Sequence, residues 1–378
     1  MMKLNKLLTG WGAINLALLL ASHGCISLKA KEISPAQMQA IYDEARTPFK
    51  YGIVIRPPHG KRVDCPSVFR CGDRWFMAYV QLENLPDGKP LGYSTQLAVS
   101  TNLLDWQSLG TILSPGASNA WDAANAGGGI ALMDTTWGGS GTLEKFDDKY
   151  WLAYIGGKNP GYETPPLATG MAFTADPSQP CAWQKLPAPV QQTTDADARD
   201  FETVQLYKAT IIHDPAATLG ASFVMFRNAC GRNLDGKTGD EKIGVSISQD
   251  MKTWKRIGTA PVLAHARIGK GKAITGDPQI VRMHNLWVMF YFGADWKPGA
   301  SGAFDTFAAS RDLVHWTDWT GSNLIDPSEP WDKTHAHKPW LIKYHGIVYH
   351  FYCAVGDQGR VIALATSKAI AISKPARR

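Results

Sequence analysis

The chain has 378 residues, of which 10% are aromatic and 36 are glycine, a composition typical of turn-rich β proteins. Its formal net charge of +6 comes from Lys3 and Lys6 and from four basic residues after position 367, so the region between them carries no net charge. That region holds no cluster of basic residues, which excludes the surface expected of a nucleic-acid-binding protein.

Residues 1–25 are typical of an export signal. Lys3 and Lys6 precede the apolar stretch 11–21, which is too short to span a membrane. Gly24 precedes Cys25, as at a lipoprotein cleavage site, although an aliphatic residue would be preferred where Ser22 stands. We therefore expect an exported protein, periplasmic or at the cell surface, whose membrane anchoring would come only from a lipidated Cys25. Cleavage by an ordinary signal peptidase is the alternative.

Segment 26–50 is predicted to contain one short helix. Ser34 can cap it, with Pro35 at the first helical position. The apolar residues that follow have the spacing of one helical face: Met38, Ile41, Tyr42 and Ala45. We expect this helix to pack on the outside of the main fold, and the strand-like run 51–55 to complete its last repeat.

A repeated phrase begins about 50 residues further on. Ser-x-(Asp/Asn)-x-x-x-Trp occurs at 100–106, 248–254 and 310–316, and a looser copy runs from Thr174 to Trp183. About 30 residues before each tryptophan, a turn is followed by an aromatic, apolar run with the signature of a buried strand. Five such runs are present: 73–80, 148–155, 221–228, 285–292 and 346–353.

Five repeats of roughly 65 residues predict an all-β fold, a five-bladed β-propeller over 51–370, with a basic tail at 371–378. A two-sheet sandwich is the alternative, which the regular repeat disfavours. Five cysteines follow Cys25, an odd and scattered set that argues against a disulfide framework. We expect them to be small buried residues.

The catalytic candidates lie where the inner strands begin, because these positions ring one mouth of the central channel. Counting back from the aromatic runs selects Asp64, Glu202, Asp277 and His337 in blades 1, 3, 4 and 5, whereas blade 2 offers only the glycine-rich stretch 138–141. Carboxylates that share one depression repel each other, which raises the pKa of at least one of them, as a general acid requires. The alternative is that these residues only initiate turns.

A second group of residues is predicted to bind substrate. Indole rings stack on sugars, and several tryptophans lie in glycine-rich loops such as 121–129. The predicted substrate-binding residues are Trp121, Asn125, Trp137, Arg199, Arg227, Trp296, His335 and Trp340. The pair His335 and His337 could supply two metal ligands, but no third ligand is marked by spacing, so neither a metal nor a cofactor is predicted.

The phrase at 310–316 resembles the Ser-x-Asp-Leu-x-x-Trp phrase of the five-bladed propeller glycosidases, glycoside hydrolase families 43 and 117 and, more distantly, 32. The resemblance covers about residues 51–370 and implies that Asp64 occupies the position of the catalytic base or nucleophile. Family 43 has Asp in blade 3 and Glu in blade 4, and this chain exchanges the two types. Family 117 has Asp in blades 1 and 4 and a His in blade 5 that acts as the general acid. Asp64, Asp277 and His337 match this pattern.

The resemblance implies an exported, exo-acting glycosidase that inverts the anomeric centre of plant or algal oligosaccharides. Asp64 would activate water, and Glu202, Asp277 or His337 would protonate the leaving oxygen. Two alternatives stay open. One is a glycoside phosphorylase of the same fold, with Arg62, Arg199, Arg227 and Lys338 as candidate phosphate ligands. The other is a non-catalytic carbohydrate-binding propeller.

Overall fold

The computed structural model describes residues 32–233, 236–264, 273–295 and 302–370. The expected signal peptide with Cys25, the candidate Trp296 and the basic tail lie outside the described residues. Within the described part of the chain, no helix combines the length and apolar character that crossing a membrane would require.

Helix α1 (Pro35–Ala45) begins with the predicted cap. The Ser34 hydroxyl accepts a hydrogen bond from the Gln37 N–H (3.3 Å), and the Gln37 side chain accepts one from the Ser34 N–H (3.2 Å). The apolar face of α1 packs in a cluster with Val281, Met283 and Leu286, as expected for a helix on the outside of the main fold.

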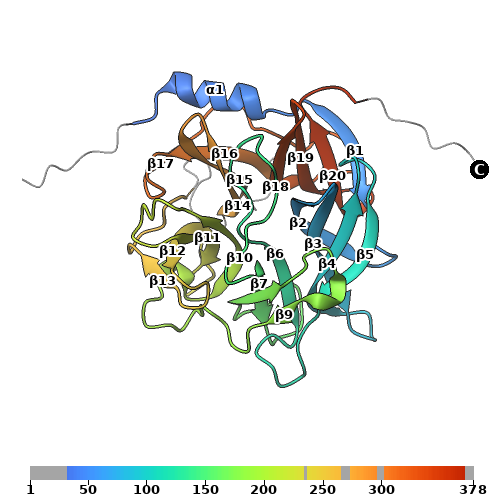
Figure 1. Cartoon of the computed structure of the whole chain (residues 1–378). Helices are drawn as coiled ribbons and strands as arrows, with labels where there is room; N and C mark the ends of the chain where they lie inside the picture. The colour runs from blue at the N-terminus through green and yellow to red at the C-terminus, as the bar shows by residue number, and fades with distance from the viewer. Residues whose placement is uncertain (1–31, 234–235, 265–272, 296–301, 371–378) are drawn as a thin grey trace, which may run out of the picture. The chain divides into compact units, whose positions relative to one another are not determined.

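Five four-stranded antiparallel sheets are arranged around one axis and form the predicted five-bladed propeller (Figure 1). Blade 1 consists of β2 (Arg62–Cys71), β3 (Arg74–Asn84), β4 (Pro90–Ser100) and β5 (Gln107–Leu113). Blade 2 consists of β6 (Asn125–Ile130), β7 (Tyr150–Gly157), β8 (Ala168–Thr174) and β9 (Gln184–Lys185). Blade 3 consists of β10 (Gln205–His213), β11 (Phe223–Cys230), β12 (Lys242–Ser248) and β13 (Lys255–Ile257). The five aromatic runs of the sequence all lie in the second strand of a blade.

The last two blades complete the ring. Blade 4 consists of β14 (Ala273–Met283), β15 (Leu286–Asp295), β16 (Phe304–Ser310) and β17 (Trp316–Asp318). Blade 5 consists of β18 (His335–Tyr344), β19 (Ile347–Gly356), β20 (Gly359–Thr366) and the N-terminal strand β1 (Phe49–Ile55). β1 pairs antiparallel with β20 from Phe49↔Thr366 to Ile55↔Ile362, so the start of the propeller region is joined to its end, as predicted.

The repeated phrase forms the same hydrogen-bonded turn in each of its three close copies. In blade 4 the Ser310 hydroxyl accepts from the N–H groups of Asp312 (3.1 Å) and Leu313 (3.0 Å). The Asp312 carboxylate accepts from the next two N–H groups, and the Trp316 indole donates to the Leu313 carbonyl (3.1 Å). Leu313 has a φ of 68°, a left-handed conformation that these bonds stabilise.

The tryptophan that ends each phrase packs on the preceding blade. Trp106 of blade 1 meets Phe351 of blade 5 edge-on at 5.7 Å between ring centroids, and Trp316 of blade 4 meets Phe226 of blade 3 at the same distance. Trp254 shares an apolar cluster with Trp151 of blade 2. The three close copies of the phrase therefore each join a blade to its neighbour.

The sequence assigned the wrong segment to the inner strand of blade 2. That strand is β6, which was expected to be a loop, and the stretch 138–141 lies in the long connection after it. Glycine is needed in β6 because its neighbours are close: a Cβ at Gly127 would lie 2.8 Å from Tyr93, and one at Gly128 would overlap Leu152.

The cysteine prediction was only partly right. Cys65, Cys230 and Cys353 are buried as expected, but Cys71 is partly exposed and Cys181 is exposed in the short 3-10 helix Pro180–Ala182. All five are free thiols.

We predict that Ser310→Ala lowers the free energy of unfolding by about 1–3 kcal/mol, because two backbone N–H groups lose their acceptor in a buried turn. Chemical denaturation measures this loss. Ser114→Ala, on the exposed connection after β5, is the matched control and should change stability by less than about 0.5 kcal/mol. Equal effects of the two substitutions would contradict the role assigned to the phrase.

Candidate functional site

The inner strands of four blades each carry a two-residue bulge near the strand start. The bulges are Cys65–Pro66 in β2, Tyr207–Lys208 in β10, Asp277–Pro278 in β14 and Lys338–Pro339 in β18. In three of them, a residue with φ between 48° and 64° precedes a proline, which has no N–H to leave unpaired where the ladder is interrupted. The first residue of each bulge faces the channel.

These side chains line a cavity of about 240 Å³ to which all five blades contribute. Its lining includes three carboxyl groups and three strongly basic side chains: Glu163, Glu241, Asp277, Lys208, Lys338 and Arg360. The inner strands supply Asp277 and the two lysines, whereas both glutamates come from connections between the second and third strands of their blades. Adjacent strands are antiparallel, so these connections lie at the same end of the channel as the inner-strand starts.

Asp64 lies behind the cavity wall and binds two cations. Its Oδ2 accepts from the Lys338 ammonium at 2.9 Å and from the Arg360 guanidinium, and its Oδ1 accepts from the Cys65 N–H at 2.9 Å. Burial alone would raise the pKa of Asp64, but Lys338 and Arg360 hold it well below the usual range. Asp64 is therefore a permanently charged anchor with both oxygens occupied, which is not the environment expected of a catalytic base.

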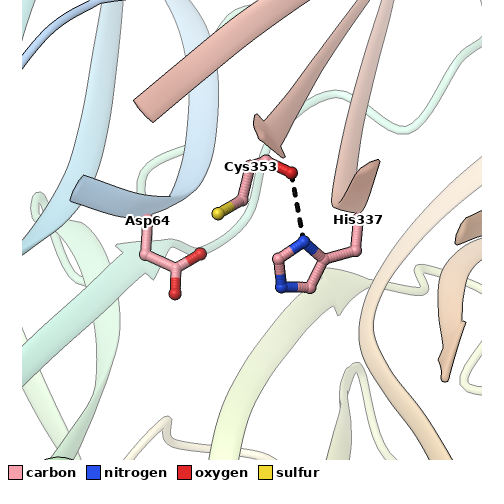
Figure 2. A group of neighbouring side chains, drawn as sticks. All are labelled: Asp64, His337 and Cys353. Atoms are coloured by element: carbon pink, nitrogen blue, oxygen red, sulfur yellow. Dashed lines mark hydrogen bonds between the residues drawn. The ribbon is translucent and has the colours of Figure 1, made fainter. Parts of the chain in front are cut away.

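Asp64, His337 and Cys353 place one potential metal ligand each within 4.8 Å of one another (Figure 2). His337 shares its Nδ1 with the Cys353 carbonyl at 3.1 Å, so that Nδ1 carries the proton and Nε2 is the free acceptor. A divalent cation at this point would lie beside the two cations bound to Asp64. The two nearby positive charges thus disfavour a metal ion at this point. Asp64, His337 and Cys353 are better described as residues that hold the ion pairs of Asp64 with Lys338 and Arg360 in place.

Burial, together with Arg360, lowers the pKa of His337 well below its usual value. The ring is therefore neutral at physiological pH and has no proton on Nε2 to give, which disfavours the acid role that the family 117 pattern implies. The nearby His335 does not line the cavity. Its Nδ1 accepts from the Ala303 N–H at 3.1 Å, and burial lowers its pKa to about 4.

Glu241 is the carboxyl group in the cavity that its surroundings keep protonated near neutral pH. Burial and the neighbouring Glu163 raise the pKa of Glu241 to about 8. Two influences oppose this shift: a hydrogen bond of 2.7 Å from the Asn228 amide to Glu241 Oε2, and the charge of Lys338. The side chain is therefore predominantly protonated at neutral pH, in a site where a donor is useful.

Glu163 differs from Glu241 in its neighbours. Burial raises its pKa too, but the charge of Lys338 and the Tyr93 hydroxyl, which donates to Glu163 Oε1 at 2.8 Å, oppose the rise. Within the described residues, Oε2 of Glu163 accepts no hydrogen bond. The two glutamates are thus close enough to interact, and their surroundings separate their pKa values.

Glu202 does not lie at the channel. It ends the 3-10 helix Asp200–Glu202 before β10 and is fully buried among Arg199, Arg227 and Arg256. Burial would raise its pKa, but the three arginines lower it to about 2. Arg199 and Arg227, predicted to bind substrate, are occupied in this cluster, which holds the 3-10 helix against the blade 3 sheet.

The described tryptophan candidates also lie away from the cavity. Trp340 is buried and donates to the Val68 carbonyl at 2.9 Å. Trp137 donates to Glu44 of α1 at 2.8 Å, next to the far end of β14. Trp121 lines a separate cavity of about 270 Å³ beside Gly156.

Asn125 is likewise structural. It is buried in β6 and accepts from the Tyr93 N–H at 3.1 Å, which links blade 2 to blade 1. Of the predicted catalytic residues, the structure brings Asp277 and His337 into the cavity wall, places Asp64 just behind it and leaves Glu202 outside.

The sequence reasoning missed Glu163, Glu241, Lys208 and Arg360. Both glutamates follow a predicted second strand, after the aromatic runs 148–155 and 221–228. The antiparallel order of a blade returns the end of its second strand to the start of its first, and this topology is the signal that would have directed attention to these loops.

No protein-family model matches the chain, and no curated protein matches it. Two solved structures are 44% identical over 92% of this chain and 98% of their own. One is described as "Glycoside hydrolase" (TM-score 0.85) and the other as a complex of BT0996 and RGII (TM-score 0.84). Both superpose on nearly the whole described region.

More distant structures share the fold. A thermostable family-43 glycoside hydrolase is 13% identical over 86% of this chain and 99% of its own, with a TM-score of 0.60. A family 117 glycoside hydrolase from the marine bacterium Zobellia galactanivorans is 12% identical over 88% of this chain and 94% of its own, with a TM-score of 0.55. At these identities the likeness supports the architecture alone.

We predict that Glu202→Gln lowers the free energy of unfolding by about 3–5 kcal/mol at pH 7, because three buried arginines lose their carboxylate. The stabilising effect of Glu202 is present above its ordinary pKa of 4.5 and is lost as the pH falls towards about 2, so the variant should also unfold with a weaker acid dependence. Denaturation curves at pH 7 and pH 3 measure both effects. The matched control is Asp200→Asn, on the exposed side of the same turn. A variant as stable as this control would contradict the structural role.

Proposed function

The chain belongs to the five-bladed β-propeller glycoside hydrolases, and on that premise we propose that it hydrolyses a glycosidic bond in the axial cavity. The observation that carries the proposal is the pair Glu163 and Glu241, two interacting carboxyl groups whose surroundings differ. Glycosidases need one carboxylic acid and one carboxylate at the scissile bond.

We assign the acid role to Glu241. A general acid must be protonated at the working pH, and a pKa of about 8 meets this requirement. Asn228 orients the carboxyl group through Oε2, which leaves Oε1 as the atom that faces the cavity and donates its proton to the glycosidic oxygen. The proton leaves with the departing sugar, and the resulting carboxylate takes a proton from solvent.

We assign the base role to Glu163. Tyr93 fixes one carboxylate oxygen, and the second is available to take a proton from a water molecule. The nearby Lys338 favours the charged form. Asp64, the base that the sequence suggested, would instead keep Lys338 and Arg360 in place and thereby set the charge around Glu163.

The shape of the cavity supports exo action. The connection 158–167 contributes Tyr162 and Glu163 to the cavity wall and is bound to three other blades: Gly161 N–H donates to Leu91 of blade 1 (2.9 Å), Arg360 of blade 5 donates to the Tyr162 hydroxyl (3.0 Å), and Gln205 of blade 3 donates to the Glu163 carbonyl. A covered cavity of about 240 Å³ accepts the end of a sugar chain rather than its middle.

The substrate is proposed to be a plant or algal oligosaccharide, and the protein is proposed to act after export. A 44%-identical structure is described as a complex with RGII, a polysaccharide, which supports a saccharide as the ligand. Export and the anchoring through Cys25 rest on residues 1–25 alone.

We predict that Glu241→Gln lowers kcat/KM on natural glycosides by about 10²–10⁴-fold while it retains activity on nitrophenyl glycosides, whose leaving group needs little protonation. In the wild type, activity on natural glycosides should fall as the pH rises through about 8, where Glu241 loses its proton. The variant should lack this alkaline limb. Initial rates from pH 5 to 10 on both substrate types give the measurement.

Glu202→Gln serves as the comparison variant for this experiment, assayed below its melting temperature. It should change both substrate types by the same factor, because its carboxylate lies outside the cavity. If Glu241→Gln also lost the same factor on both, Glu241 would not be the acid. Selective loss in Glu202→Gln would return the acid role to the residue that the sequence favoured.

The stereochemical outcome is a separate prediction. From the resemblance to families 43 and 117 we expect inversion, for which the acid and base lie about 6.5–9.5 Å apart, whereas retaining enzymes hold them about 5–5.5 Å apart. A proton NMR time course identifies the first-formed anomer before mutarotation. A first product with the anomeric configuration of the substrate would show that Glu163 acts as a nucleophile instead of a base.

A further inference from the structure

Lys208 is a buried cation that the proposed chemistry does not use. It lies in the β10 bulge and lines the cavity, with 4% of its surface exposed. Its ammonium has no hydrogen-bond partner among the described residues. The side chain extends over the Trp340 ring, 5.6 Å from its centroid, and its Cε lies 3.4 Å from where a Cβ on Gly129 would stand.

A buried ammonium without a hydrogen bond costs stability, because burial removes its hydration and no hydrogen bond compensates for the loss. The nearest opposite charge is Oδ2 of Asp277, at 3.9 Å. This separation is too long for a hydrogen bond, but one oxygen atom placed beside the pair could reach both groups. Lys208 is therefore positioned to donate a hydrogen bond to an oxygen atom of a bound ligand.

The Asp277 carboxylate likewise has an oxygen that could accept a further hydrogen bond. Its N–H donates to the Asn228 side chain at 3.3 Å, and the Cys65 thiol is 3.3 Å from its Oδ2. Within the described residues, its Oδ1 accepts no hydrogen bond. Asn228 also binds Glu241, so Asp277 is fixed next to the proposed acid.

We propose that Lys208 and Asp277 together bind a ring hydroxyl of the sugar whose bond is cleaved, and that this sugar is neutral. A hydroxyl is both an acceptor and a donor, so its oxygen accepts from the Lys208 ammonium while its proton is donated to the Asp277 carboxylate. A sugar carboxylate or a phosphate placed there would bring its own negative charge beside the Asp277 carboxylate and would be repelled by it. This inference rests on the proposed function, because it concerns the same cavity.

The charges around the cavity support a neutral ligand. Three carboxylates, those of Asp64, Glu163 and Asp277, face three cations, those of Lys208, Lys338 and Arg360. With Glu241 protonated, these described groups balance. Two of the cations are already bound to Asp64, so an acidic sugar would find only Lys208 available and would add an uncompensated charge.

The test compares Lys208→Met with the wild type, because methionine keeps the apolar stem over Trp340 and removes the ammonium. Isothermal titration calorimetry with a panel of neutral monosaccharides, the matching uronic acids and inorganic phosphate measures binding without turnover. We expect a neutral sugar to bind the wild type and to bind Lys208→Met about 10–100-fold more weakly, the range typical of a hydrogen bond to a charged group. The exposed Lys145→Met is the control and should bind as the wild type does.

Kinetics distinguish this role from the acid and from a structural role. Lys208→Met should lower kcat/KM by a similar factor on natural and nitrophenyl glycosides, unlike Glu241→Gln, because the hydroxyl contact does not involve the leaving group. The melting temperature should stay the same or rise, since a buried ammonium that makes no hydrogen bond is removed. The double variant with Asp277→Asn should lose less than the product of the two single losses, because both residues bind one hydroxyl.

Three results would overturn the inference while the glycosidase proposal stands: sugar binding by Lys208→Met equal to the wild type, tighter binding of a uronic acid than of its neutral counterpart, or phosphate binding that depends on Lys208. Failure of the proposed function would look different. The wild type would then hydrolyse neither natural nor nitrophenyl glycosides and would bind no sugar of the panel. That result would overturn both proposals.

Discussion

The bulges at the inner-strand starts are the constraint on which the site depends. A regular strand would alternate its side chains between the two faces of a blade, whereas each bulge inserts one extra residue and directs a side chain to the axis. Cys65, Asp277 and Lys338 occupy equivalent positions in three blades, each followed by a proline. Polar groups from separate blades therefore meet in one cavity, and the packed blades hold them there.

Several cations come close together at the propeller axis, and Asp64 neutralises part of their charge. Lys338 and Arg360 would otherwise be unpaired cations in a nearly closed space, and both donate to the same Asp64 oxygen. Their positions then bias the two glutamates differently, because Lys338 favours the charged form of Glu163 more directly than that of Glu241. One fixed ion-pair group thus gives the proposed acid and the proposed base different surroundings.

The sequence predicted the propeller well because its signals are local and recur in every blade. The aromatic second strand recurs in all five blades and the Ser-x-(Asp/Asn)-x-x-x-Trp turn closely in three of them, and counting back from the aromatic strands located the strand starts of Asp64, Asp277 and His337. It failed at Glu202, because a 3-10 helix before β10 turns this residue towards three arginines. It missed Glu163 and Glu241 because a residue's position within a loop does not reveal where its side chain points.

The central claim is that substrate is cleaved in the axial cavity between Glu163 and Glu241. A crystal structure of the Glu241→Gln protein with its intact oligosaccharide would test this claim most directly. The account predicts that the terminal sugar ring occupies the cavity, with the glycosidic oxygen within hydrogen-bond reach of position 241 and a water molecule near Glu163. An oligosaccharide bound elsewhere, for example in the separate cavity beside Trp121, would contradict it.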